Sequence, residues 1–158
     1  MKPVPRTLLQ SALVVVLAVG LSLAFNANRQ DSLPLIKPAQ NATQAATGEI
    51  ALTEAMALHQ NGTAVFLDAR DSLTYAEGHI RGALCLPPET FEYDFPRYEA
   101  QLANKTIVTY CDGEQCRLSH DLSTLLKAKG LTDVRVLGNG WSLWFNATLP
   151  TASGPNPE

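Results

Sequence analysis

The sequence predicts an α/β domain with a mostly parallel sheet, and three observations support this fold class. Short apolar runs of strand length recur along the chain, helical patterns separate them, and three of the runs are rich in β-branched residues. The runs are Ala64 to Asp68, Ala83 to Leu86, Thr106 to Tyr110 and Val134 to Leu137. Ligands of such sheets bind beyond the carboxyl ends of the strands, so we expect functional residues directly after a strand.

Two helices are expected beside these strands. Thr53 can cap a helix that runs to Gln60, where Asn61-Gly62 stops it. The second helix follows the third strand and has one apolar stripe of leucines. That stripe is Leu118, Leu122, Leu125 and Leu126, and it ends at Lys127, Lys129 and Gly130.

The N-terminal segment indicates a membrane. No charged residue occurs from Thr7 through Asn28, and Lys2 and Arg6 precede the apolar run Leu8 to Phe25. This run approaches the roughly 20 residues of a membrane-spanning helix. We therefore interpret residues 1–28 as a membrane anchor or signal, with Ser22-Leu23-Ala24 as the alternative cleavage site. The flanking cations keep the N-terminus in the cytoplasm, so the remainder is expected on the periplasmic or extracytoplasmic side.

The rest of the chain divides by composition. Residues 29–48 contain many small polar residues and are expected to be a flexible linker, whereas residues 147–158 carry three prolines and are expected to be a disordered tail. The folded domain is then 49–146. It holds eight Lys and Arg against thirteen Asp and Glu, a net charge of −5. This charge argues against nucleic acid and against anionic lipid as partners of the domain.

Cys111 is the candidate catalytic nucleophile. It directly follows the strand Thr106 to Tyr110, and a short loop separates it from the leucine-striped helix. Backbone amides of a tight loop and the positive end of a helix favour a thiolate and can also hold an anion. The loop residues are therefore the predicted substrate-binding residues: Asp112, Gly113, Glu114, Gln115, Cys116 and Arg117.

Several motifs in order resemble the rhodanese family of sulfurtransferases. Leu67 to Arg70 is similar to the family's strand-end motif, and Tyr75 to Ala83 contains a sequence similar to its Gly-His-Ile-x-Gly-Ala signature. Pro87 follows as in the family, and Val108 to Cys111 resembles the strand that carries the active-site cysteine. The segment Val134 to Trp144 is similar to the family's closing segment, with an asparagine in place of a usual glycine.

This resemblance implies a central five-stranded parallel sheet with helices on both faces. It also implies that Cys111 carries a persulfide: the thiolate takes a sulfane sulfur from a thiosulfate-like anion or a persulfide donor and passes it to a thiol, for example of an acceptor protein. No cofactor and no metal is implied. A non-catalytic binding or redox module of the same fold is the alternative.

The spacing from Cys111 to Arg117 is also that of cysteine phosphatases and of arsenate reductases, in which the arginine grips the oxyanion. Tyr110 and Leu118 stand where phosphatases usually have histidine and a hydroxyl residue. We therefore favour sulfur transfer over this alternative.

Cys116 has two interpretations. It is either a resolving thiol that attacks an oxidised or persulfidated Cys111, or a buried cysteine at a helix start. A disulfide across so short a loop is expected to distort the amide cradle. Cys85 is expected to be an inert core residue, and His120 to lie on the exposed side of its helix.

Three further residues are assigned structural roles. Asp68 and Arg70 are predicted to form a polar pair at the strand end, and His79 to bond the backbone of its own turn. These assignments leave the loop after Cys111 as the predicted site.

Overall fold

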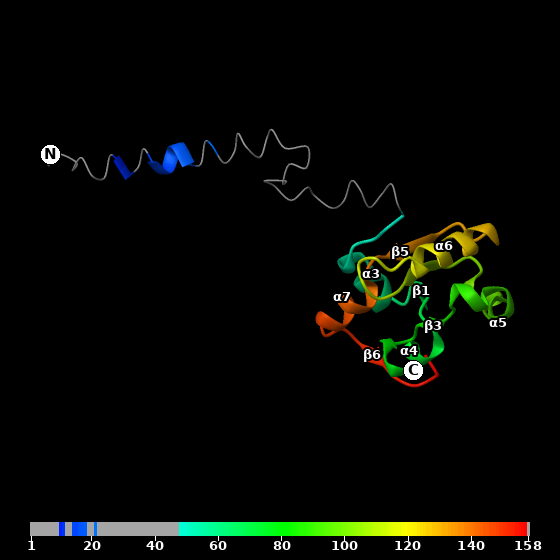
Figure 1. Cartoon of the computed structure of the whole chain (residues 1–158). Coiled ribbons are helices and arrows are strands. Elements are labelled where there is room, and N and C mark those ends of the chain that lie inside the picture. The colour runs from blue at the N-terminus through cyan, green and yellow to red at the C-terminus, as the bar shows by residue number, and fades with distance from the viewer. Residues whose placement is uncertain (1–9, 12–13, 19–20, 22–47, 158) are drawn as a thin grey trace. The chain divides into compact units, whose positions relative to one another are not determined.

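The computed structural model describes residues 10–11, 14–18, 21 and 48–157 (Figure 1). The predicted membrane segment Leu8 to Phe25 lies mostly outside the described residues, and of the predicted linker only Gly48 is described. In the part of the chain that is described, no helix has the length and apolar character needed to cross a membrane. Two units separate at residues 39 and 40, and the following account concerns the second of them.

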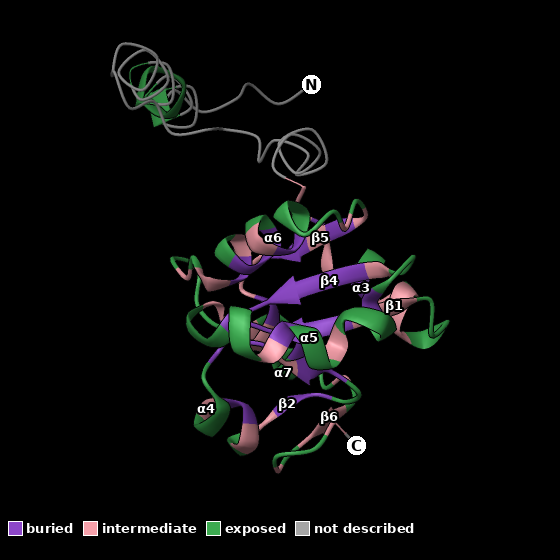
Figure 2. Cartoon of the chain, turned by 90° about the vertical axis from the view of Figure 1, so that its right-hand side faces the viewer, coloured by how far each residue is buried: buried purple, intermediate pink, exposed green. Residues whose placement is uncertain are grey.

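A parallel sheet forms the centre of this unit. Its strands are β1 (Ala64–Asp68), β3 (Leu84–Cys85), β4 (Thr106–Tyr110) and β5 (Val134–Leu137), in the order β3-β1-β4-β5. All three pairings are parallel. The central strands β1 and β4 are largely buried, as Figure 2 shows. Their β-branched and aromatic residues suit positions that are covered on both faces.

The prediction of a fifth strand in this sheet is wrong. Its place beside β5 is taken by Gly48 to Ile50, which makes a single parallel bridge between Glu49 and Val136. The Ile50 amide donates to Val136 O at 2.8 Å, and the Val136 amide donates to Gly48 O at 2.9 Å. The chain enters a helix at Leu52. That turn ends the pairing before a strand of ordinary length can form.

Helices cover both faces of the sheet, as predicted. Helices α3 (Leu52–Gln60) and α7 (Gly140–Asn146) lie on one face, and α5 (Phe91–Leu102) and α6 (Leu118–Ala128) lie on the other. Successive strand residues point to opposite faces, so Phe66 and Val108 pack with the first pair of helices and Leu67 and Ile107 with the second. The short elements α4 (Ser72–Glu77) and η1 (Pro88–Thr90) lie in connections.

The first helix begins earlier than predicted. Its N-cap is Ala51 rather than Thr53, and Ala51 makes no side-chain cap. The backbone carbonyl of Ala51 instead accepts from the amides of Glu54 and Ala55, both at 3.1 Å. Because Ile50 is still bonded to β5, the helix starts where that pairing ends, and the position of the cap is set by the sheet.

The prediction of a disordered tail is also wrong. Strand β6 (Thr151–Ala152) pairs antiparallel with β2 (His79–Ile80). Trp144 Nε1 donates to Pro150 O at 2.9 Å, and the Gly154 amide donates to Ala76 O at 2.7 Å. Backbone groups and one indole hold the segment, and its prolines still supply carbonyl acceptors, so the lack of an apolar period did not imply disorder.

Candidate functional site

Cys111 directly follows β4 at the carboxyl end of the sheet. It is fully buried and belongs to the core between the sheet and the helices α5 and α6. Its carbonyl accepts from the Trp141 amide at 3.0 Å, which ties the strand end to the start of α7. Gly140 permits this close approach, because a Cβ there would lie 2.6 Å from the Tyr110 Cβ. These contacts hold the backbone of Cys111 against the start of α7.

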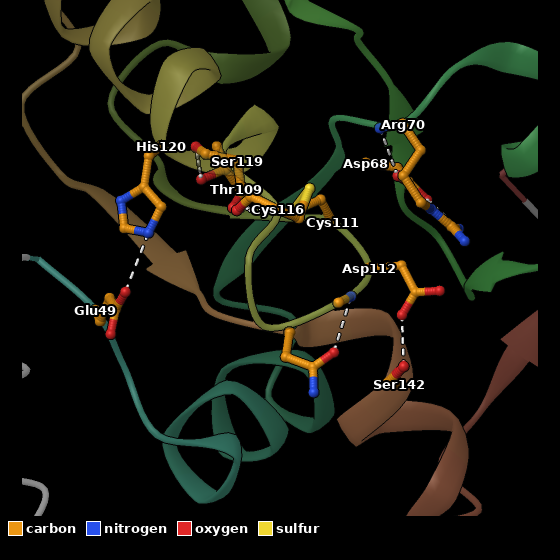
Figure 3. The surroundings of a disulfide bond; sticks show 12 residues. Glu49, Asp68, Arg70, Thr109, Cys111, Asp112, Cys116, Ser119, His120 and Ser142 are labelled. Atoms are coloured by element: carbon orange, nitrogen blue, oxygen red, sulfur yellow. Dashed lines mark hydrogen bonds and ion pairs between the residues drawn. A yellow bond between two sulfur atoms is a disulfide. The ribbon is translucent and has the colours of Figure 1, made fainter.

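Cys111 and Cys116 form a disulfide across the loop (Figure 3). Their Cα atoms lie 6.4 Å apart, within the usual range for a disulfide. Cys111 is fully buried, whereas Cys116 is only partly buried. Cys116 is thus paired with Cys111 in this structure, and its role as a resolving thiol stays a prediction. The site is in its oxidised form.

Two amides of the predicted cradle are already paired within the protein. The Gly113 amide donates to Asn139 Oδ1 at 2.9 Å, and the Cys116 amide donates to Gly113 O at 3.2 Å. These two loop amides are thus bonded to protein oxygens and are not donors to an anion in this form.

Asn139 explains a departure from the family pattern. Its φ is +50°, in the left-handed region that a glycine would occupy at no cost. Asparagine tolerates this conformation, and its side chain then reaches the loop after Cys111 to accept from Gly113. The substitution therefore adds a latch between the loop and the start of α7.

The other predicted loop residues lie at the surface. Asp112, Glu114, Gln115 and Arg117 are exposed. The Asp112 carboxylate accepts from the Ser142 hydroxyl, as Figure 3 shows. Arg117 is the N-cap of α6, and its carbonyl accepts from the Asp121 amide at 2.9 Å. The structure brings these residues together around the loop, but their role in substrate binding stays a prediction.

Ser119 is a site residue that the sequence reasoning missed. Its Oγ lies 3.4 Å from Cys111 Sγ, and Ser119 is almost fully buried in the first turn of α6. Its carbonyl accepts from the Thr109 hydroxyl at 2.9 Å, which fixes that turn against β4. Ser119 precedes Leu122 by three residues and Leu126 by seven, on the leucine stripe. A small polar residue on an apolar stripe is the signal that could have identified it.

The polar pair at the end of β1 is confirmed as structural. Arg70 Nε donates to Asp68 Oδ1 at 2.9 Å, and Arg70 Nη2 donates to Asp68 Oδ2 at 2.6 Å and to Gly78 O at 2.7 Å. Asp68 is fully buried and Arg70 is 5% exposed. The Arg70 guanidinium also lies 4.8 Å from the Trp141 ring centroid. These partners compensate much of the cost of removing both charges from water.

His79 and His120 lie as predicted. His79 is fully buried, its Nδ1 lies 2.9 Å from Tyr75 O in its own turn, and its ring stacks on Tyr75. His120 faces outward, with its Nε2 3.0 Å from Glu49 Oε1. Figure 3 shows the His120–Glu49 pair and the Asp68–Arg70 pair on opposite sides of the disulfide.

Cys85 and Tyr110 are both weaker acids than usual, and the cause is the same. Burial raises the pKa of the Cys85 thiol to about 11, and the nearby Asp68 carboxylate adds to this effect. Burial likewise raises the pKa of Tyr110 well above its ordinary value. The Tyr110 hydroxyl accepts from the Ile80 amide at 3.1 Å. Both groups are neutral at physiological pH, which agrees with the structural role predicted for Cys85.

Comparisons with known proteins agree on one family. The family model of the rhodanese-like domain matches residues 51–147. The thiosulfate sulfurtransferase GlpE of Pseudomonas fluorescens is 37% identical over 107 residues, covering 66% of this chain and 91% of that protein. The solution structure of the rhodanese-like domain of the Anabaena Alr3790 protein has a TM-score of 0.57 and 26% identity, covering 68% of this chain and 80% of that one. The tRNA uridine(34) hydroxylase of Salmonella arizonae is 36% identical over 63 residues, only 18% of its length.

Proposed function

Because the chain belongs to the rhodanese-like domain family, we propose that it is a sulfurtransferase that moves a sulfane sulfur through a persulfide on Cys111. The donor is thiosulfate or a persulfide, and the acceptor is a thiol or another nucleophile. The observation that carries the proposal is the place of Cys111, at the end of β4 and against the first turn of α6. The likeness to a thiosulfate sulfurtransferase over most of that protein's length supports the same chemistry.

The reaction consists of two displacements at sulfur, and it starts from the reduced loop. The Cys111 thiolate attacks the outer sulfur of thiosulfate, the S–S bond of the donor breaks, and sulfite leaves with the electron pair. The acceptor then attacks the outer sulfur of the persulfide, and Cys111 leaves as a thiolate. The second step regenerates the thiolate that the first step consumed, so the cycle requires no cofactor.

The surroundings of Cys111 suit an anionic sulfur. The Ser119 hydroxyl, 3.4 Å away, can donate to a thiolate, and the amino end of α6 carries partial positive charge. Donors placed in advance in this way stabilise the anion in both displacements.

We further propose that the domain works outside the cytoplasm, attached to a membrane by Leu8 to Phe25. The uncharged run behind Lys2 and Arg6 supports this orientation. The Cys111–Cys116 disulfide suits an oxidising compartment. Cell fractionation with protease added to intact spheroplasts tests the proposal: a digested, membrane-associated domain is expected. A soluble product that begins after Ala24 would show cleavage, and a protected domain would contradict the orientation.

The activity is tested on the full chain after reduction. With thiosulfate and cyanide we expect release of sulfite and thiocyanate, and mass spectrometry should find one added sulfur on Cys111. Cys111→Ser should abolish both signals, whereas the control Cys85→Ser should retain them. A reduced wild-type protein that gains no sulfur would instead favour a binding module.

The same proteins separate sulfur transfer from oxyanion chemistry. A phosphatase or arsenate reductase requires both Cys111 and Arg117, because the arginine must grip the oxyanion. A sulfurtransferase should retain sulfur loading in Arg117→Ala and should not hydrolyse an aryl phosphate.

A further inference from the structure

The two sulfur atoms of the disulfide have different surroundings. Cys116 lines a cavity of about 390 Å³, and Cys111 is not part of its wall. We call this space the Cys116 cavity. Its other walls include Glu49, Leu52, Glu114, His120, Asn139 and Leu143. Cys111 lies in the core and is fully buried.

We propose that the Cys116 cavity is a binding site for an external thiol, which opens the disulfide by attacking Cys116 and releases Cys111. Thiol–disulfide exchange at Cys116 is then a second chemistry of this domain. One consequence of this exchange, that sulfur transfer requires prior reduction of the disulfide by a thiol, rests on the proposed function. The exchange itself does not.

The exchange balances as follows. A thiolate RS⁻ attacks Cys116 Sγ, an R–S–S–Cys116 bond forms, and the bond to Cys111 Sγ breaks. The electron pair of that bond goes to Cys111, which becomes a thiolate. A second thiolate attacks the sulfur of R, RSSR forms, and Cys116 leaves and takes up a proton. Two thiols are thereby oxidised to one disulfide, and the loop disulfide is reduced to a dithiol.

Access and the leaving group both favour this direction of attack. The nucleophile must approach along the S–S axis from the side opposite the leaving sulfur; Cys116 lines the cavity, whereas Cys111 is fully buried. The leaving sulfur is Cys111, beside the Ser119 hydroxyl and the amino end of α6. Attack on Cys111 would instead place the group R inside the core. The preferred product is therefore a mixed disulfide on Cys116.

The charge of the cavity wall points to the class of thiol. Two carboxylates, Glu49 and Glu114, line the cavity beside one histidine, and His120 Nε2 lies 3.0 Å from Glu49 Oε1. Glu114 is exposed and adds a negative charge at the mouth of the cavity. An uncharged or cationic thiol should therefore enter more readily than an anionic one.

The point of attack is measured on the oxidised full chain carrying Cys85→Ser. A brief pulse of β-mercaptoethanol is stopped with acid, and free thiols are then alkylated. A protease that cleaves after Glu114 separates Cys111 from Cys116, so mass spectrometry can assign each modification. We expect the mercaptoethanol adduct on Cys116 and the alkyl group on Cys111. An adduct mainly on Cys111, or shared equally, would overturn the proposal.

The cavity itself is tested by filling it. A Cβ at Gly138 would lie 3.6 Å from Glu49 Oε1, an ordinary contact, so Gly138→Leu can enter the cavity without forcing the backbone. This variant should slow disulfide reduction by roughly tenfold or more, because the attacking thiolate loses its line of approach. Ala128→Leu, at an exposed position of α6, is the matched control and should not change the rate. Equal rates in both variants would contradict a role of the cavity.

The choice of thiol is tested with two reagents of similar size. We compare β-mercaptoethanol with mercaptoethanesulfonate at low salt, and each rate is divided by the thiolate concentration. The sulfonate should react about threefold more slowly, the effect of one charge at a distance of several ångströms in water. Glu114→Gln should narrow this difference. No difference in the wild-type protein would contradict the charge assignment.

Failure of this inference is distinguishable from failure of the proposed function. The exchange assay contains no sulfur donor, so an adduct on Cys116 supports the inference even if the reduced protein never accepts sulfur. Conversely, sulfur loading together with attack at Cys111 would leave the proposed function in place and reject the inference. If both hold, oxidised wild type should gain no sulfur before thiol is added, whereas Cys116→Ser should load without it.

Discussion

Two corners of the domain follow neighbouring parallel strands, and they differ in how completely their polar groups are paired. After β1, Asp68 and Arg70 are buried and bonded to each other. After β4, the loop from Cys111 to Arg117 is largely exposed, and its cysteines form a disulfide. The two corners are adjacent, since the Ala69 amide donates to Tyr110 O at 2.9 Å. The same edge of the sheet thus supports a structural pair at one strand and a reactive group at the next.

The comparison teaches that position alone does not identify a functional residue. Both corners lie where α/β sheets bind ligands. At the first corner the charged atoms are hydrogen-bonded to protein partners. At the second, Cys111, the proposed nucleophile, has one hydroxyl neighbour and a disulfide partner that a thiol can displace. The following predictions test whether this difference is real, from the largest expected effect to the smallest.

Arg70→Ala should cause the largest change in stability. It leaves the buried Asp68 carboxylate without its partner, which typically costs about 3–5 kcal/mol. Arg97→Ala removes an exposed pair with Asp94 and should cost no more than about 1 kcal/mol. Urea unfolding of both variants measures the difference. Similar losses of unfolding free energy in the two variants would mean that the buried Asp68–Arg70 pair contributes no more than an exposed ion pair.

The thiol beside the first corner should be nearly inert. With a pKa of about 11, roughly 0.1% of Cys85 is thiolate at pH 8, about 100-fold less than for an unperturbed thiol. Because its pKa is raised, the reactive form grows as the pH rises and levels off only above pH 11. Alkylation rates of Cys85 and Cys111 in the reduced protein, measured from pH 7 to 10, test this. Comparable rates at pH 8 would erase the contrast between the corners.

Ser119→Ala should slow sulfur loading of reduced Cys111 by on the order of tenfold at neutral pH, since a hydrogen bond to a charged group contributes about 1.5–3 kcal/mol. The loss should shrink at higher pH, where the thiolate forms without help. Ser123→Ala, on the same buried face of α6, is the control and should leave the pH profile unchanged. A loss that is the same at every pH would make Ser119 a packing residue.

Asn139 variants should show the smallest effect. Asn139→Gly keeps the positive φ but removes the acceptor of the Gly113 amide, and the expected cost is about 0.5–1 kcal/mol. Asn139→Ala also strains the left-handed backbone and should cost about 1 kcal/mol more. Faster hydrogen exchange of the Gly113 amide in both variants is the direct readout. Unchanged exchange would show that the latch does not hold the loop.

Much of the fold was predictable because its signals are local. The ranges of β1, β4 and β5 agree with the sequence predictions to the residue, since β-branched runs flanked by turn residues mark buried strands. Helix α5 was missed. It contains Pro96 in its interior, and an interior proline is a sequence signal against a helix.

The errors concern features that depend on distant parts of the chain. The pairing of β6 with β2 is made by backbone groups, which leave no side-chain pattern. The fifth strand came from the family resemblance, and this chain turns into α3 before it can form. At the site, the place of Cys111 followed from the strand that precedes it. The closeness of Ser119 depends on how α6 docks on β4, which spacing alone does not determine.

The pairing of β6 with β2 also bears on how the protein is made. Ile80 meets Thr151, and Trp144 Nε1 donates to Pro150 O, so residues 150–152 close the fold against a strand synthesised about 70 residues earlier. This segment is synthesised after all four strands of the parallel sheet. The nascent chain can therefore assemble the sheet before the segment that completes this ribbon has been made.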